Sequence, residues 1–350
     1  MHERVWRPMF AALALVCLSL FAAACGSSSD NKSTSSSTSS SGTKSAAAPG
    51  KPESGTFRMG IEPWLGYGPW RIAEAKGIFK KNGLDVKIIN FATDDQINAA
   101  FASGKIDGTN VATHTALRFV GQGLPLKAVL LEDVSLNADA ILAGKDVNSI
   151  KDLKGKKVAY EEGTTSDILL AYALAQNGMS KSDIQPVPIP ASDAGTAFLA
   201  GRVPVAVTYE PYLTTALQKD KNAKLLYTAG KNPGLIGDVF AVSDDTIKNK
   251  PGQVAALIKS WGEAVDYYNA HKAEGQAIIT KAVGSKPGDL TTAFNGVKLY
   301  DLAQNKSQLS GDYVNKTIVD VEKAAKSVGL LKSNVDPKSF VVPTFVDQAK

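Results

Sequence analysis

From about residue 56 onward, short apolar runs alternate with segments whose apolar residues recur every three or four positions. The runs predict buried strands, and the segments between them predict amphipathic helices. In the first half of the chain, strands are expected at residues 56–61, 85–90, 106–110 and 126–131, with helices near 69–75, 94–103 and 113–121. This alternation is typical of βαβ units built around a mostly parallel sheet.

A second set of the same kind follows an extended stretch at residues 139–143. Its strands are expected at 157–160, 184–188, 205–208 and 223–227, and its helices at 164–177, 191–200 and 212–219. After residues 239–243 the pattern predicts helices at 250–271, 288–304 and 313–328. About 295 residues exceed one comfortable core, so two α/β lobes are expected, lobe 1 at 55–143 and 240–350 and lobe 2 at 144–239.

The N-terminus has the layout of a secretory signal peptide at residues 1–24. Arg4 and Arg7 precede an uncharged apolar run at 9–24, which ends in three alanines before Cys25. The run is shorter than the roughly 20 residues that span a bilayer, so a permanent anchor helix is not expected. Its end resembles a bacterial lipobox, although Ala22 stands where leucine is usual. The resemblance implies a lipid (palmitate) on Cys25; an ordinary cleaved signal peptide is the alternative.

Residues 26–50 contain eleven serines, three threonines and no aromatic or branched aliphatic residue. Such a segment cannot bury a core and is expected to be disordered. Placed directly after a lipidated cysteine, residues 25–54 are interpreted as a tether that holds the folded part at the outer face of the cytoplasmic membrane.

Cysteine content and charge exclude several classes of protein. Cys17 lies in the signal peptide and Cys25 would carry lipid, which excludes a disulfide framework, a cysteine-based metal site and a cysteine nucleophile. Without residues 1–24, 37 basic residues stand against 33 acidic ones, a balance that does not indicate nucleic-acid binding. The two histidines that follow the predicted signal peptide, His114 and His271, are 157 residues apart and make no zinc site. Hydrolase, metalloprotease and phosphate-loop motifs are absent, so neither an enzyme nor a cofactor is expected.

A series of segments in order resembles the nitrate/sulfonate/taurine-type periplasmic binding proteins. The segments are EPWLGYGPW at 62–70, AEAKGIFKKNGLDV at 73–86, SGKID at 103–107, IKDLKGKKV at 150–158, EGTT at 162–165 and TYEP at 208–211. VAYEEGT at 158–164 and PGLIGD at 233–238 are similar to the branch found beside urea-carboxylase-type systems. Pro204 departs from the family, which has an acid there, and Tyr209 replaces the usual tryptophan, which is expected to alter the ligand pocket.

The resemblance implies two α/β lobes joined by crossing strands at 139–143 and 239–243, with the ligand between them. It also implies a monomeric substrate-binding protein that delivers a small solute to the permease of an ABC importer. The enzymatic alternative is the thiamine-pyrimidine branch of the same fold, as a precursor-binding protein or a synthase. The synthase carries a cysteine-rich active-site segment that this chain lacks.

Ligands of open α/β sheets bind beyond the carboxyl ends of the strands. Thirteen residues at those ends are the candidate ligand-binding residues: Trp64, Tyr67, Asp94, Thr113, His114, Ser135, Asn137, Glu162, Thr164, Thr165, Tyr209, Glu210 and Asp238. Some of them have a purely structural alternative. Trp64 or Tyr67 could pack the following helix, Asp94 and Thr164 could be helix caps, and a lone histidine such as His114 is often structural.

The candidate cleft is rich in acids and contains no lysine or arginine. Its carboxylates are Glu62, Asp94, Asp133, Asp139, Glu161, Glu162, Glu210 and Asp238. An inorganic anion such as nitrate would lack its usual cationic partner. A ligand with an amine, amidine or amide is favoured, such as a taurine-like zwitterion or a relative of urea or guanidine. The alternative is that most of these acids cap helices or face solvent.

Overall fold

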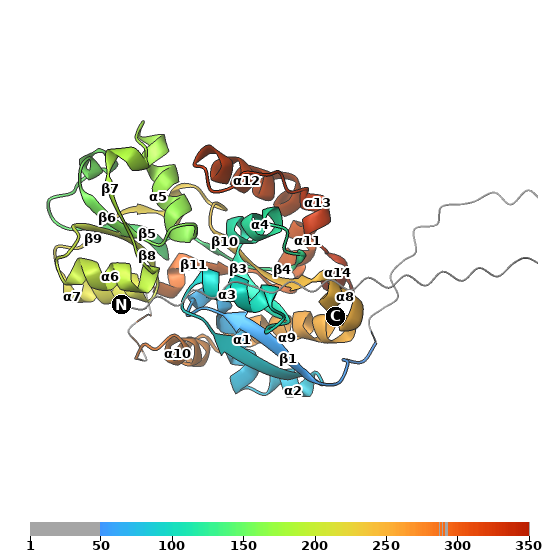
Figure 1. Ribbon diagram of the computed structural model, residues 1–350. Helices are drawn as coiled ribbons and strands as arrows, with labels where there is room; N and C mark the ends of the chain where they lie inside the picture. The colour runs from blue at the N-terminus through green and yellow to red at the C-terminus, as the bar shows by residue number, and fades with distance from the viewer. Residues whose placement is uncertain (1–49, 287, 289, 291–292, 350) are drawn as a thin grey trace, which may run out of the picture. The chain divides into compact units, whose positions relative to one another are not determined.

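The computed structural model describes residues 50–286, 288, 290 and 293–349, and two β-sheets with flanking helices make up the fold (Figure 1). The first sheet has the order β11-β4-β10-β3-β1-β2 and the second the order β7-β6-β8-β5-β9. The strands of the first sheet are β1 (Thr56–Ile61), β2 (Asp85–Asn90), β3 (Gly108–Ala112), β4 (Leu126–Ser135), β10 (Gly237–Ser243) and β11 (Val297–Leu299). Those of the second are β5 (Asp139–Ala143), β6 (Lys157–Tyr160), β7 (Gln185–Pro188), β8 (Val205–Tyr209) and β9 (Lys224–Thr228).

Most strands of each sheet run in one direction, as the sequence predicts. β1 is parallel to β2 and β3, and β6 is parallel to β7 and β8. The exceptions include β10, which lies antiparallel between β3 and β4, and β5, which lies antiparallel between β8 and β9. The predicted two-sheet α/β architecture is confirmed.

The chain passes between the sheets at residues 136–138 and 229–236. The two stretches expected to cross, 139–143 and 239–243, are therefore full members of a sheet. β5 and β10 each enter their sheet from the side of the other sheet, which explains why each is antiparallel to its neighbours. The division into lobes at residues 143 and 240 stays a prediction.

The helices of the first half are α1 (Gly68–Ala75), α2 (Ile78–Lys81), α3 (Asp94–Ala102), α4 (Thr113–Gly121), α5 (Thr165–Gln176), α6 (Ala191–Leu199) and α7 (Tyr212–Lys219). Those that follow are α8 (Asp244–Asn249), α9 (Pro251–Ala270), α10 (Lys272–Ala282), α11 (Leu302–Leu309), α12 (Ile318–Ser327), α13 (Pro337–Phe340) and α14 (Thr344–Gln348). The prediction of a helix at 288–304 is wrong, because residues 297–299 form β11 and pair with β4. Tertiary pairing there overrides the local pattern.

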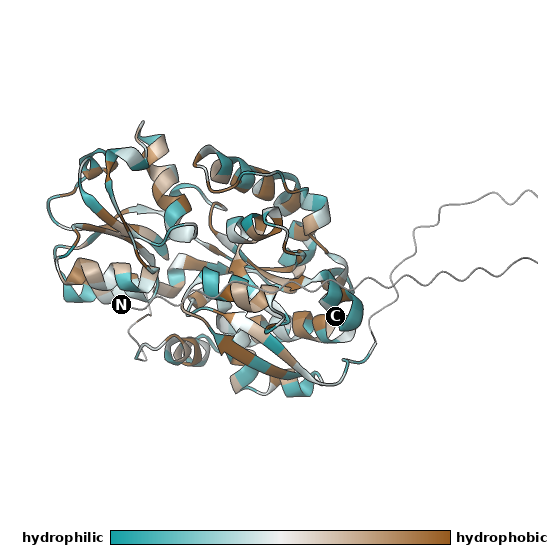
Figure 2. Ribbon diagram, in the orientation of Figure 1, coloured by the Kyte–Doolittle hydropathy of each residue, from teal (hydrophilic) through white to brown (hydrophobic). Residues whose placement is uncertain are grey.

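Apolar residues gather on the strands of both sheets, whereas the surrounding helices mix apolar and polar residues (Figure 2). Trp70 lies at the centre of the first core, with ring centroids 4.9 Å from Trp261 and 5.3 Å from Phe240. Its Nε1 donates to Asn110 and Glu132, two buried polar residues of the sheet. These two hydrogen bonds give partners to polar atoms that burial would otherwise leave without any.

The predicted signal peptide at 1–24, Cys25 and the tether up to residue 49 lie outside the described residues. Residues 50–54, the end of the predicted tether, are attached to the fold through Glu53, whose carboxylate accepts from the N–H groups of Gly252 and Gln253 at the start of α9. In the part of the chain that the structure describes, no helix is long and apolar enough to cross a membrane.

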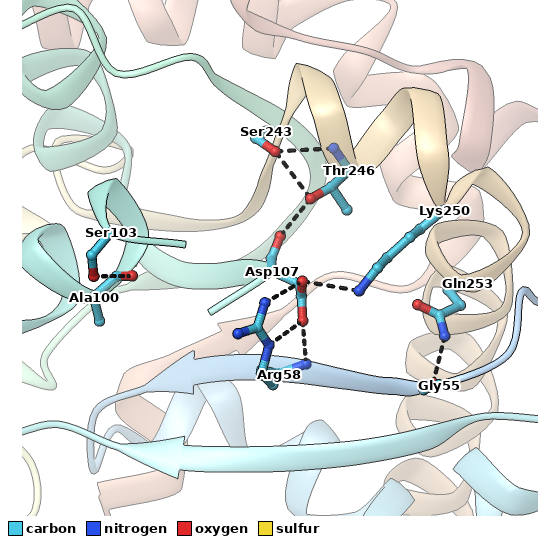
Figure 3. A network of polar contacts seen from close by, with 9 residues as sticks. All are labelled: Gly55, Arg58, Ala100, Ser103, Asp107, Ser243, Thr246, Lys250 and Gln253. Carbon is cyan, nitrogen blue, oxygen red and sulfur yellow. Dashed lines mark hydrogen bonds and ion pairs between the residues drawn. The ribbon is translucent and has the colours of Figure 1, made fainter. Parts of the chain in front are cut away.

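A polar network around Asp107 joins β1, the start of β3 and α9 (Figure 3). Arg58 donates to both carboxylate oxygens of Asp107 at 2.8 Å, and Lys250 donates to one at 2.9 Å. Thr246 donates to the backbone carbonyl of Asp107 at 3.0 Å. Burial alone would raise the pKa of Asp107, but the hydrogen bonds from Arg58 and Lys250 outweigh it and hold that pKa below its usual value.

We expect Asp107→Asn to lower the free energy of unfolding by about 1–2 kcal/mol, because two cations lose their shared partner. The estimate is modest because Arg58 is 39% exposed and solvent screens the pair. The contribution is present above the ordinary carboxyl pKa and disappears as the pH falls through the lowered folded value. Urea unfolding at pH 7 measures the change. Asp266→Asn, at an exposed aspartate, is the control; equal stability of the two variants would contradict the network's role.

Candidate functional site

A small cavity lies between the edges of the two sheets. Its volume is about 40 Å³, and it is lined by Glu62, Trp64, Tyr67, Asp94, Ala112, Asp139, Glu161, Thr164, Thr165, Tyr209, Ile236 and Asp238. Pockets for drug-sized ligands measure roughly 300–1,000 Å³, so this one suits a molecule of a few non-hydrogen atoms.

The direction of the strands explains why these residues meet. Glu62, Glu161 and Tyr209 stand at or just after the carboxyl ends of β1, β6 and β8. β5 and β10 run the other way, so their first residues reach the same edge: Asp139 lies opposite Tyr209, and Asp238 lies opposite Ala112. Strands of both directions therefore contribute acids to one place.

Seven of the thirteen predicted residues line the cavity: Trp64, Tyr67, Asp94, Thr164, Thr165, Tyr209 and Asp238. Glu62, Asp139 and Glu161, which the sequence places only among the cleft carboxylates, line it as well. Ala112 and Ile236 are apolar wall residues that carry no recognisable sequence signal. The remaining six predicted residues lie outside the lining.

Those six have other partners or face solvent. Thr113 donates to the carbonyl of Gly237, and Ser135 accepts from the N–H of Asp139. Glu210 accepts from the N–H and hydroxyl of Thr214, which makes it a cap of α7. The side chains of Asn137 and Glu162 are exposed. His114 is the sixth.

His114 and Arg118 stand four residues apart on α4 and both approach the start of α5. Burial, with the charge of Arg118, lowers the pKa of His114 to about 3, so the ring is neutral. Its Nε2 lies 3.4 Å from the hydroxyl of Thr115, and its Nδ1 is buried without a hydrogen-bond partner. The guanidinium carbon of Arg118 lies 3.6 Å from where a Cβ on Gly163 would stand.

The expectation of a cleft without basic residues is thus incomplete. Arg118 does not line the cavity, but its charge acts on Asp94 and Glu161, lowering the pKa of each against the effect of burial. Helical spacing with His114 is the signal that could have revealed it.

Five carboxylates line the cavity, and burial is the largest cause of their raised pKa values. The pKa of Asp94 rises to about 6, and those of Asp139 and Glu161 rise to about 7. The pKa values of Glu62 and Asp238 lie well above the usual range, because neighbouring acids add to the effect of burial. The carboxyl groups of the empty site thus keep their protons to a higher pH than exposed carboxyl groups do.

Asp133 and Asp238 form a buried carboxyl pair beneath the cavity. They stand opposite each other on β4 and β10, and burial together with nearby acids raises the pKa of each well above its usual value. Trp64 Nε1 donates to Asp133 Oδ2 at 3.1 Å and thereby orients one wall of the cavity. A Cβ at Gly66 would collide with the Asp133 carboxylate, so this close approach requires glycine.

Tyr209 connects the two sheets across the cavity. Its hydroxyl, on β8, donates to Glu62 Oε2 at 3.2 Å, and its ring meets the edge of Trp64 at 5.8 Å. Glu62 Oε1 and Asp139 Oδ2 are buried and have no hydrogen-bond partner. These two oxygens have no partner within the protein and can hydrogen-bond to a ligand. Among the described residues, no cluster of histidine, cysteine, aspartate and glutamate side chains could hold a metal ion.

A family model, NMT1/THI5 like, matches residues 67–274. The chain belongs to this family. A taurine-binding periplasmic protein of Escherichia coli is 26% identical over 79% of this chain and 89% of its own length. A Brucella abortus protein named only as a binding protein is 26% identical over 78% and 86%. A Haemophilus influenzae protein named for thiamine biosynthesis is 27% identical over 77% and 86%.

Solved structures show the same fold. The alkanesulfonate-binding protein SsuA of Xanthomonas axonopodis, bound to MOPS, superimposes with a TM-score of 0.71 at 21% identity, covering 83% of this chain and 99% of SsuA. The nitrate-binding protein NrtA of Synechocystis gives 0.68 at 19% identity, covering 86% and 87%. The resemblance that the sequence indicates is therefore confirmed. The chain shares its family with relatives named as binding proteins, and it shares its fold with solved binding proteins of ABC importers.

The raised pKa values predict how the stability of the ligand-free protein depends on pH. A carboxyl group whose pKa is higher in the folded state keeps its proton longer there, so stability falls as the pH rises toward the folded value. For Asp139 the loss between about pH 6.5 and 8 is about 1 kcal/mol, which lowers Tm by about 2–4 °C. His114, held neutral, has the opposite effect, but mainly below its ordinary value of 6.5.

Calorimetry of the ligand-free protein across that range measures the effect. Asp139→Asn removes a titrating group and should reduce the slope, whereas Glu162→Gln, at an exposed position, should leave it unchanged. A stability that rises from pH 6.5 to 8 would show that the cavity carboxyls are ionised in the folded state.

Proposed function

We propose that this chain is a monomeric, lipid-anchored solute-binding protein that captures a small polar molecule and delivers it to an ABC permease. The solute contains nitrogen or sulfur and is taurine- or sulfonate-like, or urea-, guanidine- or amide-like. The observation that carries the proposal is the cavity between the sheets, whose polar lining comes from both of them. A ligand there would bridge the two halves of the fold and hold them together.

The relatives support this reading of the cavity. One is named for taurine, and the solved SsuA and NrtA structures are named for alkanesulfonate and nitrate. The second candidate is a thiamine-pyrimidine precursor, which the Haemophilus influenzae relative and the combination of aromatic walls with carboxylates favour. The corresponding synthase is not proposed, because the chain has cysteines only at positions 17 and 25.

For the function, we expect a screen of the purified protein by thermal shift to find its solute among sulfonates, ureas, guanidines, amides and aminopyrimidines. A solute at 100 times its Kd should stabilise the protein by about 2.7 kcal/mol. Deleting the gene should then abolish cellular uptake of that solute at low concentration, and restoring the gene should recover it. A solute that binds but whose uptake does not depend on the gene would argue against a role in import.

For the anchor, we expect Cys25→Ser to release the protein from the membrane fraction, because the residue that would carry the lipid is gone. Cys17→Ser is the matched control, since Cys17 lies inside the predicted signal peptide and its loss should leave the protein in the membrane fraction. Fractionation followed by immunoblotting measures both. If the Cys25→Ser protein remains with the membrane, the lipoprotein assignment is wrong.

A further inference from the structure

The charge of the cavity is one-sided. Glu62, Asp94 and Asp238 approach it from the first sheet, and Asp139 and Glu161 approach it from the second. Among the residues that line it there is no lysine or arginine, although the charge of Arg118 acts on Asp94 and Glu161. An acidic group of a ligand would face several carboxylates and find no cation to pair with.

Two acceptor atoms in the cavity are unused. Asp139 is 4% exposed, and its Oδ2 has no hydrogen-bond donor; Glu62 Oε1, held in place through the Tyr209 contact to Oε2, has none either. A buried acceptor without a donor is unfavourable, so a ligand that donates N–H groups to both would gain their full hydrogen-bonding energy. The two atoms belong to different sheets, so such a ligand would bridge them.

The start of α5 does not provide an alternative site for an anion. Its positive end is already occupied by a carboxylate of its own chain: Asp167 Oδ2 accepts from the N–H of Gly163 at 3.0 Å, and Lys181 pairs with Asp167. Thr164 uses its hydroxyl to cap the N–H of Ser166. A carboxylate of the chain itself therefore already lies at the helix end where an anion normally binds.

Aromatic rings form the rest of the wall. Trp64, Tyr67 and Tyr209 line the cavity beside the acids. Aromatic faces attract cations, and most strongly where water is excluded. A flat cation can direct its N–H edge to the carboxylates while its faces contact rings. The small volume restricts the ligand to a few non-hydrogen atoms.

We infer that the solute is a compact organic cation with several N–H donors and no acidic group, of the amidinium or guanidinium class. It is held between Asp139 of the second sheet and Glu62 of the first, beside Glu161, which lines the cavity and accepts from the N–H of Ala191 through Oε2. This inference rests on the proposed binding function and narrows it: sulfonates, taurine and nitrate are excluded as the preferred solutes.

The test compares matched probes by isothermal titration calorimetry on the mature lipoprotein in detergent. Guanidinium and acetamidinium are the probes of the proposed class. Urea has the shape of guanidinium without its charge, tetramethylammonium has the charge without N–H donors, and taurine and methanesulfonate carry an acid. We expect guanidinium or acetamidinium to bind at least tenfold more tightly than each of the four comparison probes.

Variants locate the binding. Asp139→Asn and Glu161→Gln should each weaken binding of the best cation at least tenfold, because each removes one charge and keeps the shape of the side chain. Glu162→Gln is the matched control, since Glu162 is adjacent in sequence but exposed and outside the lining, and it should bind as the wild type does. Circular dichroism of each ligand-free variant verifies that it is folded.

The outcomes separate the two proposals. If taurine or methanesulfonate binds more tightly than either cation, the solute class is overturned and the binding function stands. If the cation binds but the Asp139 and Glu161 variants bind it normally, the class inference fails because the cavity carboxylates do not hold it. If no probe binds more tightly than about 1 mM, the class inference falls, and the wider solute screen decides the binding function by itself.

Discussion

The reversed insertion of β5 and β10 decides where the chemistry of this protein lies. In each sheet the parallel strands end at one edge, and the reversed strand begins there, so Asp139 and Asp238 join acids that follow β1 and β6. The same reversal follows from the path of the chain, which leaves one sheet and enters the other twice. Topology thus concentrates carboxylates at the position where an open α/β sheet binds its ligand.

Such a cluster is costly in an empty site. Removing a carboxylate from water disfavours its charged form, and acids placed side by side disfavour one another. The protein lowers this cost in two ways: raised pKa values let Asp133 and Asp238 keep their protons to higher pH, and Trp64 and Tyr209 donate to Asp133 and Glu62. The carboxyl oxygens that remain without a partner, Glu62 Oε1 and Asp139 Oδ2, belong to residues that line the cavity. A ligand that supplies positive charge and N–H groups would complete these interactions, which links affinity to the state of the carboxyls.

Much of the fold could be predicted from the sequence. The strand at 56–61, the strand at 85–90 and the two-sheet α/β class follow from local patterns of apolar residues, which depend on the chain's own neighbours. The failure at 297–299 has a physical cause, since that strand exists because β4 offers it an edge. The sequence also predicted cavity-lining residues that stand at or after the carboxyl end of a strand, such as Trp64 and Tyr209.

Tertiary structure decided which of those candidates meet. The local pattern of the chain predicts that acids flank several strands, with Glu210 after one and Asp238 at the beginning of another. Only the fold shows that Glu210 caps α7 while Asp238 lines the cavity, and that Arg118 reaches the acids from α4. Strand ends can be read from local sequence, but the partner of a carboxylate depends on residues distant along the chain. That partner decides whether the group stabilises a helix or remains free for a ligand.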